Sequence, residues 1–214
     1  MTPFGRSDTL SCVALSVVPR PVPQTDAELV TACVAGDPAA QRLLFRREYA
    51  RVNATVYRII GSARDADDLV QETFIAVFRG LARFRGDSKL STWIDRIAVR
   101  VVFHHLRGAK QKPTLPLDVI GDIEGPGGAV DDQAHARDGL RRLYDALAEL
   151  SPESRAVFAL FAIDGRSIAE IAKITQSTTV AVKCRIWRAR REVMKRAAQD
   201  PVLAELVHTE EETR

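Results

Sequence analysis

The densest set of chemically active side chains in this sequence is a run of basic residues between positions 179 and 196. The run holds seven lysines or arginines against one glutamate, a net charge of +6, whereas the whole 214-residue chain carries only +3. Cationic groups at this density suit a polyphosphate backbone, whose counterions they release on binding. The run therefore predicts nucleic-acid binding by one local element rather than by a generally basic protein.

Capping signals around this run predict a helix-turn-helix. Ser167 and Glu170 have the spacing of a capping box, which predicts a short helix that ends near residue 175. A turn at 176–178 then leads into a long helix over about 179–198. A short helix, a tight turn and a longer basic helix are typical of proteins that read the DNA major groove. The alternative, a solvated basic helix without a ligand, is disfavoured by the capping box and the turn length.

The start of the long helix and its exposed face supply the first candidates for contacts with double-stranded DNA. Thr178 and Thr179 can donate to a phosphate beside the free backbone amides of the helix start. Lys183, Trp187 and Arg188 are candidates for base edges or flanking phosphates.

A second group of side chains, at 83–93, combines cations, aromatic rings and small polar groups. That mixture suits single-stranded DNA, because an unpaired base can enter a pocket and stack on a ring. The preceding segment, 65–74, places acidic residues on a predicted helix. Taken alone, those acidic residues are typical of a solvated face near a helix start.

Helical spacing and capping residues predict the elements that position these groups. The first three helices begin after N-cap residues Thr25, Asp37 and Ser62. Glycines at positions 36 and 61 are typical helix stops. The predicted helices of this half of the chain lie at 26–35, 38–60, 63–81 and 90–107.

Residues 109–137 are rich in proline, glycine and acidic residues, which predicts a flexible acidic linker. Beyond them, leucines from 140 to 150 predict one helix, and Ser151 with Pro152 begins another that ends at Gly165. The expected fold class is all-α, with two small helical domains joined by the linker. The predicted boundaries are a leader at 1–24, a first domain at 25–108, the linker at 109–137, a second domain at 138–199 and an acidic tail at 200–214.

Several classes of protein are disfavoured. Three widely spaced cysteines without a CxxC pair argue against a disulfide framework or structural zinc site and favour a cytoplasmic protein. His104 and His105 point to different faces of a helix and have no companion ligands at metal-binding spacing, so we expect no metal, no cofactor and no enzyme activity. The apolar run 10–18 precedes three prolines rather than a cleavage site, and no stretch is long enough for membrane insertion.

Three linked motifs together resemble the extracytoplasmic-function group of bacterial sigma-70 RNA polymerase sigma factors. They are DADDLVQETF at 65–74, RFRGDSKLSTWIDRIA at 83–98 and SIAEIAK…VKCRIWRARR at 167–191. The resemblance covers about 25–198 and implies a sigma region 2-like first domain and a region 4-like second domain. It implies a promoter-specificity subunit that performs no covalent chemistry and serves a stress or envelope regulon. The implied partners are core RNA polymerase, promoter DNA and an anti-sigma factor.

The resemblance also implies residue roles at three surfaces. Core polymerase would bind Asp67, Asp68, Gln71, Glu72 and Phe74. The −10 element, with a flipped base, would bind Arg83, Phe84, Arg85, Asp87, Ser88, Lys89, Trp93, Arg96, Arg100 and His104. The −35 duplex would bind Thr178, Thr179, Lys183, Cys184, Arg185, Trp187, Arg188 and Arg191.

Three positions depart from the family pattern. Many relatives have asparagine where this chain has Arg100, glycine and an apolar residue at 176–177, and serine at Cys184. The arginine leaves the −10 preference of this chain open. The alternative function is a stand-alone helix-turn-helix regulator with a sensor or dimerisation domain, which predicts dimers that bind palindromic DNA.

Overall fold

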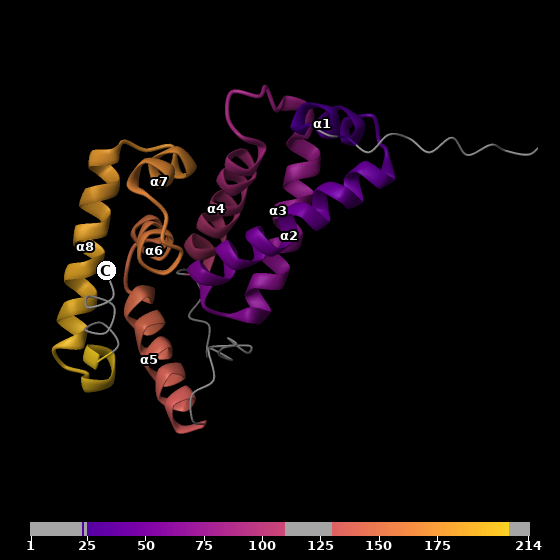
Figure 1. Cartoon of the computed structure of the whole chain (residues 1–214). Coiled ribbons are helices and arrows are strands. Elements are labelled where there is room, and N and C mark those ends of the chain that lie inside the picture. The colour runs from indigo at the N-terminus through magenta and orange to yellow at the C-terminus, as the bar shows by residue number, and fades with distance from the viewer. Residues whose placement is uncertain (1–22, 24, 110–129, 206–214) are drawn as a thin grey trace, which may run out of the picture.

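The computed structural model describes residues 23, 25–109 and 130–205, and no β-strand occurs among them (Figure 1). The first half of the chain forms α1 (Asp26–Val34), α2 (Pro38–Ile60), α3 (Ala63–Gly80) and α4 (Leu90–Ala109), with a 3₁₀ turn at Leu81–Arg83 after α3. The second half forms α5 (Val130–Ala148), α6 (Pro152–Phe158), a π-helical turn (Ala159–Ile163), α7 (Ile168–Thr175) and α8 (Thr179–Ala197). The all-α expectation is confirmed.

The predicted helix starts of the first half are confirmed in their cap chemistry. Thr25 and Glu28 form the expected capping box on α1, and the Asp37 side chain accepts from the backbone N–H of Ala39. Ser62 accepts from the N–H of Asp65 at the start of α3. Gly61 ends α2 with φ +76°, a left-handed conformation that glycine adopts at little cost.

The helix-turn-helix lies where the sequence predicts it. Ser167 and Glu170 form a reciprocal capping box on α7, and the Thr178 side chain accepts from the N–H of Ala181 to cap α8. Gln176 takes the left-handed conformation between the two helices, with φ +50°. That conformation explains why a turn of this geometry commonly holds glycine.

Helical structure extends across two of the predicted domain boundaries. Helix α5 begins at Val130, inside the predicted linker, because the proline and glycine residues end at Gly128 and residues 129–138 contain neither. The predicted tail also contributes to the fold. Residues 201–205 are helical, Asp200 accepts from the N–H groups of Val202 and Leu203, and Leu203 is buried. Residues 110–129, most of the leader and 206–214 lie outside the described residues.

The core of the first half continues into the second half. Helices α2, α3 and α4 contact one another and bury an aliphatic cluster that includes Leu44, Val56 and Ile94. The same cluster includes Leu160 of the π-helical turn and Ile171 of α7. Helix α4 contacts both α6 and α7, and α2 contacts the π-helical turn, so the two halves dock against each other (Figure 1). The sequence predicted two domains and did not predict this docking.

A second cluster belongs to the second half alone. It joins Leu143 and Leu147 of α5, Ala189 and Val193 of α8, and Leu203. This packing fixes one face of α8 and leaves the other to solvent. Of the helices that the structure describes, none has the length and apolar character required to cross a membrane.

Candidate functional site

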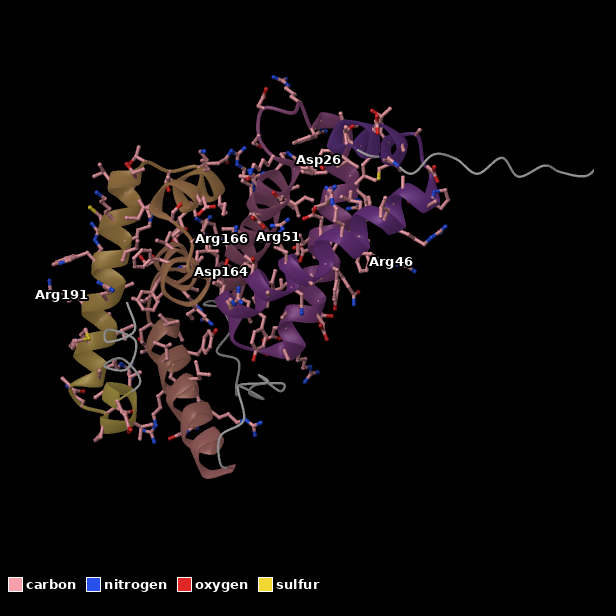
Figure 2. All side chains as sticks on the ribbon, viewed as in Figure 1. Asp26, Arg46, Arg51, Asp164, Arg166 and Arg191 are labelled. Carbon is pink, nitrogen blue, oxygen red and sulfur yellow. The ribbon has the colours of Figure 1, made fainter. Side chains whose placement is uncertain are left out.

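Helix α8 has one buried face and one exposed basic face. Val182, Ile186, Ala189 and Val193 pack inward. The outward side chains are exposed, with Arg185 only partly so: Thr178, Thr179, Lys183, Cys184, Arg185, Trp187, Arg188 and Arg191. Figure 2 shows Arg191 at the outer edge of the molecule. The eight predicted duplex contacts therefore lie at the start of α8 or outside its buried stripe.

Some cations of α8 form ion pairs within the chain, and others do not. Lys195 and Arg196 pair with Glu192 and Glu149. Within the described part of the chain, no ion pair engages Lys183 or Arg188. Arg190, which lies between the predicted contacts and is itself exposed, places its guanidinium over the Phe161 ring, 5.8 Å from the ring centroid. The unpaired cations are free to meet a phosphate or a base edge.

Trp187 adds a large apolar surface to the centre of this basic face. Its side chain is 61% exposed, and the Arg191 guanidinium lies 5.6 Å from the ring centroid. The Cys184 thiol is exposed and free on the same face. An exposed tryptophan flanked by arginines is better suited to a binding surface than to a solvated helix.

The acidic group of α3 forms one exposed face. Asp67, Asp68, Gln71 and Glu72 are all exposed, one helical turn apart. Phe74 is not part of this face, because it is only 4% exposed and belongs to the core. Including Phe74 among the surface contacts was therefore wrong, and its place in the apolar stripe of α3 explains the burial.

Three exposed apolar side chains were not predicted from the sequence. Ile75 continues the acidic face of α3 and is 51% exposed. Phe45 and Tyr49 of α2 are 38% exposed, with ring centroids 5.2 Å apart, and Phe45 also stacks against Phe74 at 4.6 Å. In the sequence these residues are indistinguishable from core residues, and their exposure becomes visible only in the structure.

The segment between α3 and α4, together with the first turn of α4, holds two aromatic rings beside a cationic rim. Phe84 and Trp93 are partly buried and meet edge to face, 5.5 Å between centroids. Around them the structure exposes four charged side chains and partly exposes one hydroxyl: Arg83, Arg85, Asp87, Lys89 and Ser88. Rings next to cations are the composition expected for stacking unpaired bases and neutralising their phosphates.

The remaining three predicted contacts follow one face of α4 at four-residue spacing. Arg96 is partly buried, and its Nε donates to the backbone oxygen of Lys173 at 2.9 Å. Arg100 donates to the side-chain oxygen of Gln176 at 3.4 Å, while His104 is exposed. Two of the three residues are thus engaged by the end of α7 and the turn that follows it. Among the described residues, no cluster of His, Cys, Asp and Glu could hold a metal ion.

Comparisons with known proteins match both halves of the chain. The family model of Sigma-70 region 2 matches residues 44–112, and that of Sigma-70, region 4 matches residues 140–193. The first match contains the acidic face of α3 and the segment before α4, and the second contains the helix-turn-helix.

Curated relatives cover most of the chain. The chain is 34% identical over 167 residues to the ECF RNA polymerase sigma factor SigM of Mycobacterium tuberculosis, covering 78% of this chain and 82% of SigM. It is 35% identical over 176 residues to the ECF RNA polymerase sigma-E factor of Escherichia coli, covering 78% of this chain and 91% of that protein. It is 30% identical over 196 residues to the RNA polymerase sigma-H factor of Pseudomonas aeruginosa, covering 85% of this chain and 97% of that protein.

Two solved structures share the fold. CnrH in complex with the cytosolic domain of CnrY has 26% identity and a TM-score of 0.57, covering 80% of this chain and 96% of that one. RpoE of Bartonella quintana in complex with the anti-sigma factor NepR has 20% identity and a TM-score of 0.53, covering 74% of this chain and 97% of that one. With both regions matched and relatives above 30% identity, the chain belongs to the extracytoplasmic-function (ECF) family of RNA polymerase sigma factors.

Proposed function

We propose that three surfaces of this sigma factor divide the work of promoter recognition. The acidic face of α3 holds core polymerase, the segment from 83 to 104 binds the −10 element, and α8 reads the −35 duplex. The chain itself is a specificity subunit and not an enzyme, so polymerase supplies the chemistry. The observation that carries the proposal is the exposed basic face of α8, on which Lys183 and Arg188 have no described ion-pair partner.

The −35 surface combines position and charge. Thr178, Thr179 and the first amides of α8 receive a phosphate, because a helix start carries free N–H groups and a partial positive charge. Lys183, Trp187 and Arg188 reach base edges or flanking phosphates from the exposed face. The remaining predicted contacts, Cys184, Arg185 and Arg191, line the same side.

The −10 surface is built for an unpaired strand. Phe84 and Trp93 provide the walls on which a flipped base stacks, and Arg83, Arg85 and Lys89 meet its phosphates. Asp87 and Ser88 offer acceptors for base edges, and Arg96, Arg100 and His104 continue the track along α4. Because a guanidinium only donates hydrogen bonds, Arg100 reads a different base edge from an asparagine.

Core polymerase binds a surface that is both acidic and apolar. Asp67, Asp68, Gln71 and Glu72 supply its charge, and Ile75 extends it with exposed apolar area. Phe45 and Tyr49 contribute further aromatic area from α2. Exposed apolar residues rimmed by charges are typical of a protein–protein interface.

An anti-sigma factor is the proposed regulatory partner, and the cytoplasm, where polymerase acts, is the proposed location. The support is the resemblance in sequence and the solved complex of CnrH with the cytosolic domain of CnrY. The relatives SigM and sigma-E support a regulon of the ECF type, concerned with stress or the envelope. As domain boundaries we propose 25–108 for the region 2-like part and 138–199 for the region 4-like part, in line with the matched ranges 44–112 and 140–193.

Run-off transcription with core polymerase on genomic fragments tests this function. A sigma subunit yields promoter-dependent transcripts that core polymerase alone does not make. A stand-alone regulator instead yields no such transcript, while the free protein forms dimers and shifts a palindromic duplex. That second result would overturn the proposal.

A further inference from the structure

Val180, the second residue of α8, is an apolar side chain that the fold leaves in solvent. Its exposed fraction of 67% is the largest of any large apolar residue that the structure describes. A β-branched residue is also a weaker helix former than alanine or leucine, so a valine here does not favour the helix. The helix is capped by Thr178, whose side chain accepts from the N–H of Ala181. Neither packing nor capping therefore accounts for Val180.

Val180 begins a row of side chains along the outer side of α8. Val180, Cys184 and Trp187, here called the outer row, follow one another at spacings of four and three residues, so they project from one face of the helix. All three are exposed, and the Cys184 thiol, which behaves as a small apolar group, is free. The residues that α8 buries lie on the opposite side: Val182, Ile186, Ala189, Val193 and Ala197.

Cations border the outer row on both sides. Because each residue turns an α-helix by about 100°, Lys183 lies on one flank of the outer row and Arg188 on the other. Both side chains are exposed, and in the described part of the chain no ion pair engages either. The major groove of DNA has a matching cross-section, with base edges on its floor and phosphates along both walls. A helix lying in this groove with the outer row inward therefore directs Lys183 and Arg188 to the phosphates.

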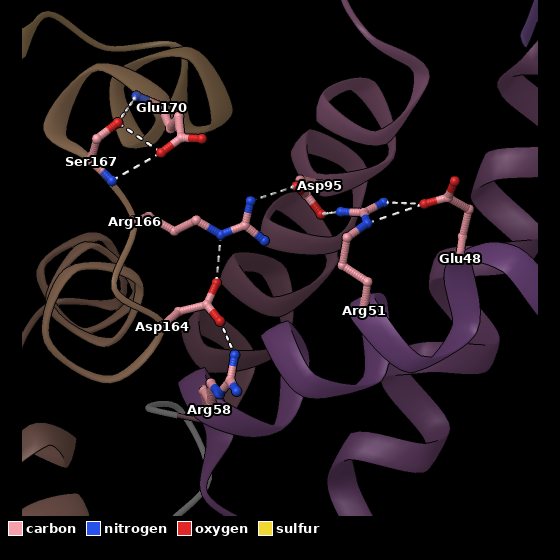
Figure 3. Close-up of polar contacts among 8 residues, drawn as sticks. All are labelled: Glu48, Arg51, Arg58, Asp95, Asp164, Arg166, Ser167 and Glu170. Atoms are coloured by element: carbon pink, nitrogen blue, oxygen red, sulfur yellow. Dashed lines mark hydrogen bonds and ion pairs between the residues drawn. The ribbon is translucent and has the colours of Figure 1, made fainter.

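The position of Val180 is fixed by the helix that precedes it. Ser167 and Glu170 cap α7 through reciprocal hydrogen bonds, in which the Ser167 N–H donates to the Glu170 carboxylate at 3.0 Å (Figure 3). At the other end of α7, the hydroxyls of Thr175 and Ser177 are hydrogen-bonded at 2.6 Å, in the turn that leads to α8. Since both ends of α7 are tied in this way, α8 begins at a defined place.

From this arrangement we propose that Val180 reads the C5-methyl group of a thymine in the −35 element. The inference rests on the proposed −35 role of α8 and adds the base that this helix selects. The thymine methyl is the apolar group that base edges present in the major groove, among hydrogen-bond donors and acceptors. The N-terminal residues of a recognition helix are the ones that contact base edges. Val180 offers two methyl groups and no hydrogen bond, so thymine is the base that it fits.

The other class of occupant for the outer row is a protein. An exposed apolar patch also suits a protein partner, but the core of a protein interface is depleted in charged residues. Here the apolar row lies between cations, and residues 179–196 carry a net charge of +6, which suits a polyanion. The charge around the outer row therefore favours duplex DNA.

Removal of a single methyl group from the DNA tests the proposal. The full chain, assembled with core polymerase, is titrated with duplexes that carry the −35 region of a promoter found by run-off transcription. In each duplex one thymine is replaced by deoxyuridine, which lacks only the methyl group and pairs as before. At one thymine we expect the affinity of the unaltered chain to fall about fourfold, the effect of one buried methyl group.

Val180→Ala removes the contact from the protein side. We expect it to weaken binding of the thymine duplex about fourfold and to abolish the difference between thymine and deoxyuridine, because the methyl group has lost its partner. The variant should fold, since Val180 is exposed and alanine is the best helix former. The matched control is Val34→Ala, which truncates another exposed valine, on α1. The control should keep both the affinity and the deoxyuridine effect of the unaltered chain.

A further pair of duplexes separates the methyl group from the base that carries it. When the T·A pair at that position is replaced by C·G, a C5-methyl group on the cytosine should raise the affinity of the unaltered chain about fourfold. The same methyl group should leave the affinity of Val180→Ala unchanged.

Three results would overturn the assignment of Val180. They are the absence of a deoxyuridine effect at every thymine, an undiminished effect in Val180→Ala, and a loss in Val180→Ala of affinity for core polymerase instead of DNA, which would make the outer row a protein contact. Failure of the unaltered chain to bind any −35 duplex would overturn the proposed −35 role itself. Duplex binding without a methyl effect would overturn only the reading of thymine.

Discussion

The two proposed DNA-reading regions of this sigma factor differ in how many of their side chains already have partners within the chain. On α8 the predicted contacts are exposed, and Lys183 and Arg188 engage no described ion pair. On α4, Arg96 and Arg100 each make one hydrogen bond to the end of α7 or the following turn, while Arg100 stays exposed. Duplex DNA is present before initiation, whereas the −10 strand becomes available only when the promoter melts. The two regions thus differ in how far the second half of the chain already engages their proposed contacts.

The largest expected effect comes from Asp68→Arg, which removes both readers from the promoter at once. Asp68 is exposed on α3, and its reversal opposes the proposed polymerase contact. We expect affinity for core polymerase to fall by about a hundredfold, the scale of a charge reversal at a protein interface. Measured by competition for core enzyme, the control Asp145→Arg on the exposed side of α5 should match the unaltered chain. If Asp68→Arg bound core polymerase with unchanged affinity, the acidic face of α3 would not be the polymerase contact.

A smaller loss of affinity is expected from Arg188→Ala, which changes only the proposed −35 surface. Removing an arginine that meets a base or phosphate should weaken binding to the −35 duplex by about thirtyfold, in the free chain as in the holoenzyme. Arg190→Ala is the matched control, because that arginine stacks over Phe161 instead. If the two variants weakened duplex binding equally in a titration of labelled −35 DNA, Arg188 would not be a specific DNA contact.

Phe84→Ala tests the proposed −10 surface. Loss of one stacking ring should lower the yield of open complex by about tenfold while the affinity for −35 duplex stays unchanged. Permanganate reactivity of unpaired thymines in the −10 region measures the opening, and Phe84→Tyr, which keeps the ring, should retain most of it. A parallel loss in duplex affinity would show that the ring supports folding rather than strand capture.

The smallest effect is expected at the start of α7, the helix that packs against α4. Ser167→Ala removes the cap of α7 and should lower the free energy of unfolding by about 1 kcal/mol. Ser167 also holds the pKa of Glu170 below its usual value through hydrogen bonds. The stabilisation is therefore complete above the ordinary pKa of a glutamate and is lost as the pH falls through the lowered folded value. Denaturant titrations between pH 3 and 7 should show this acid loss in the unaltered chain and a weaker one in Ser167→Ala.

The sequence predicted most of the elements because their signals are local. Thr25, Ser62 and Ser167 cap the helices expected of them, and the helix-turn-helix lies between Ser167 and the end of α8 as expected. The exposed basic face of α8 followed from helical spacing alone. Local chemistry of this kind depends on neighbours within four residues, so a single sequence contains it.

The docking of the halves was not predictable in the same way. Asp95, Arg155 and Asp164 read as ordinary surface charges, and only the fold shows that they are buried against partners 44 to 106 residues away. Phe74 shows the converse limit. Its neighbours at 67–72 are exposed, and its burial depends on Phe45 from another helix. Contacts between distant elements decide both cases.

The most direct test of the central contrast is the affinity of the free chain for two probes from one promoter, a −35 duplex and the −10 nontemplate strand. Arg188→Ala should weaken binding of the duplex about thirtyfold and leave binding of the single strand unchanged, whereas Phe84→Ala should weaken binding of the single strand alone, because the two proposed surfaces lie on different elements. A loss for both probes in either variant would contradict two separate DNA-reading surfaces.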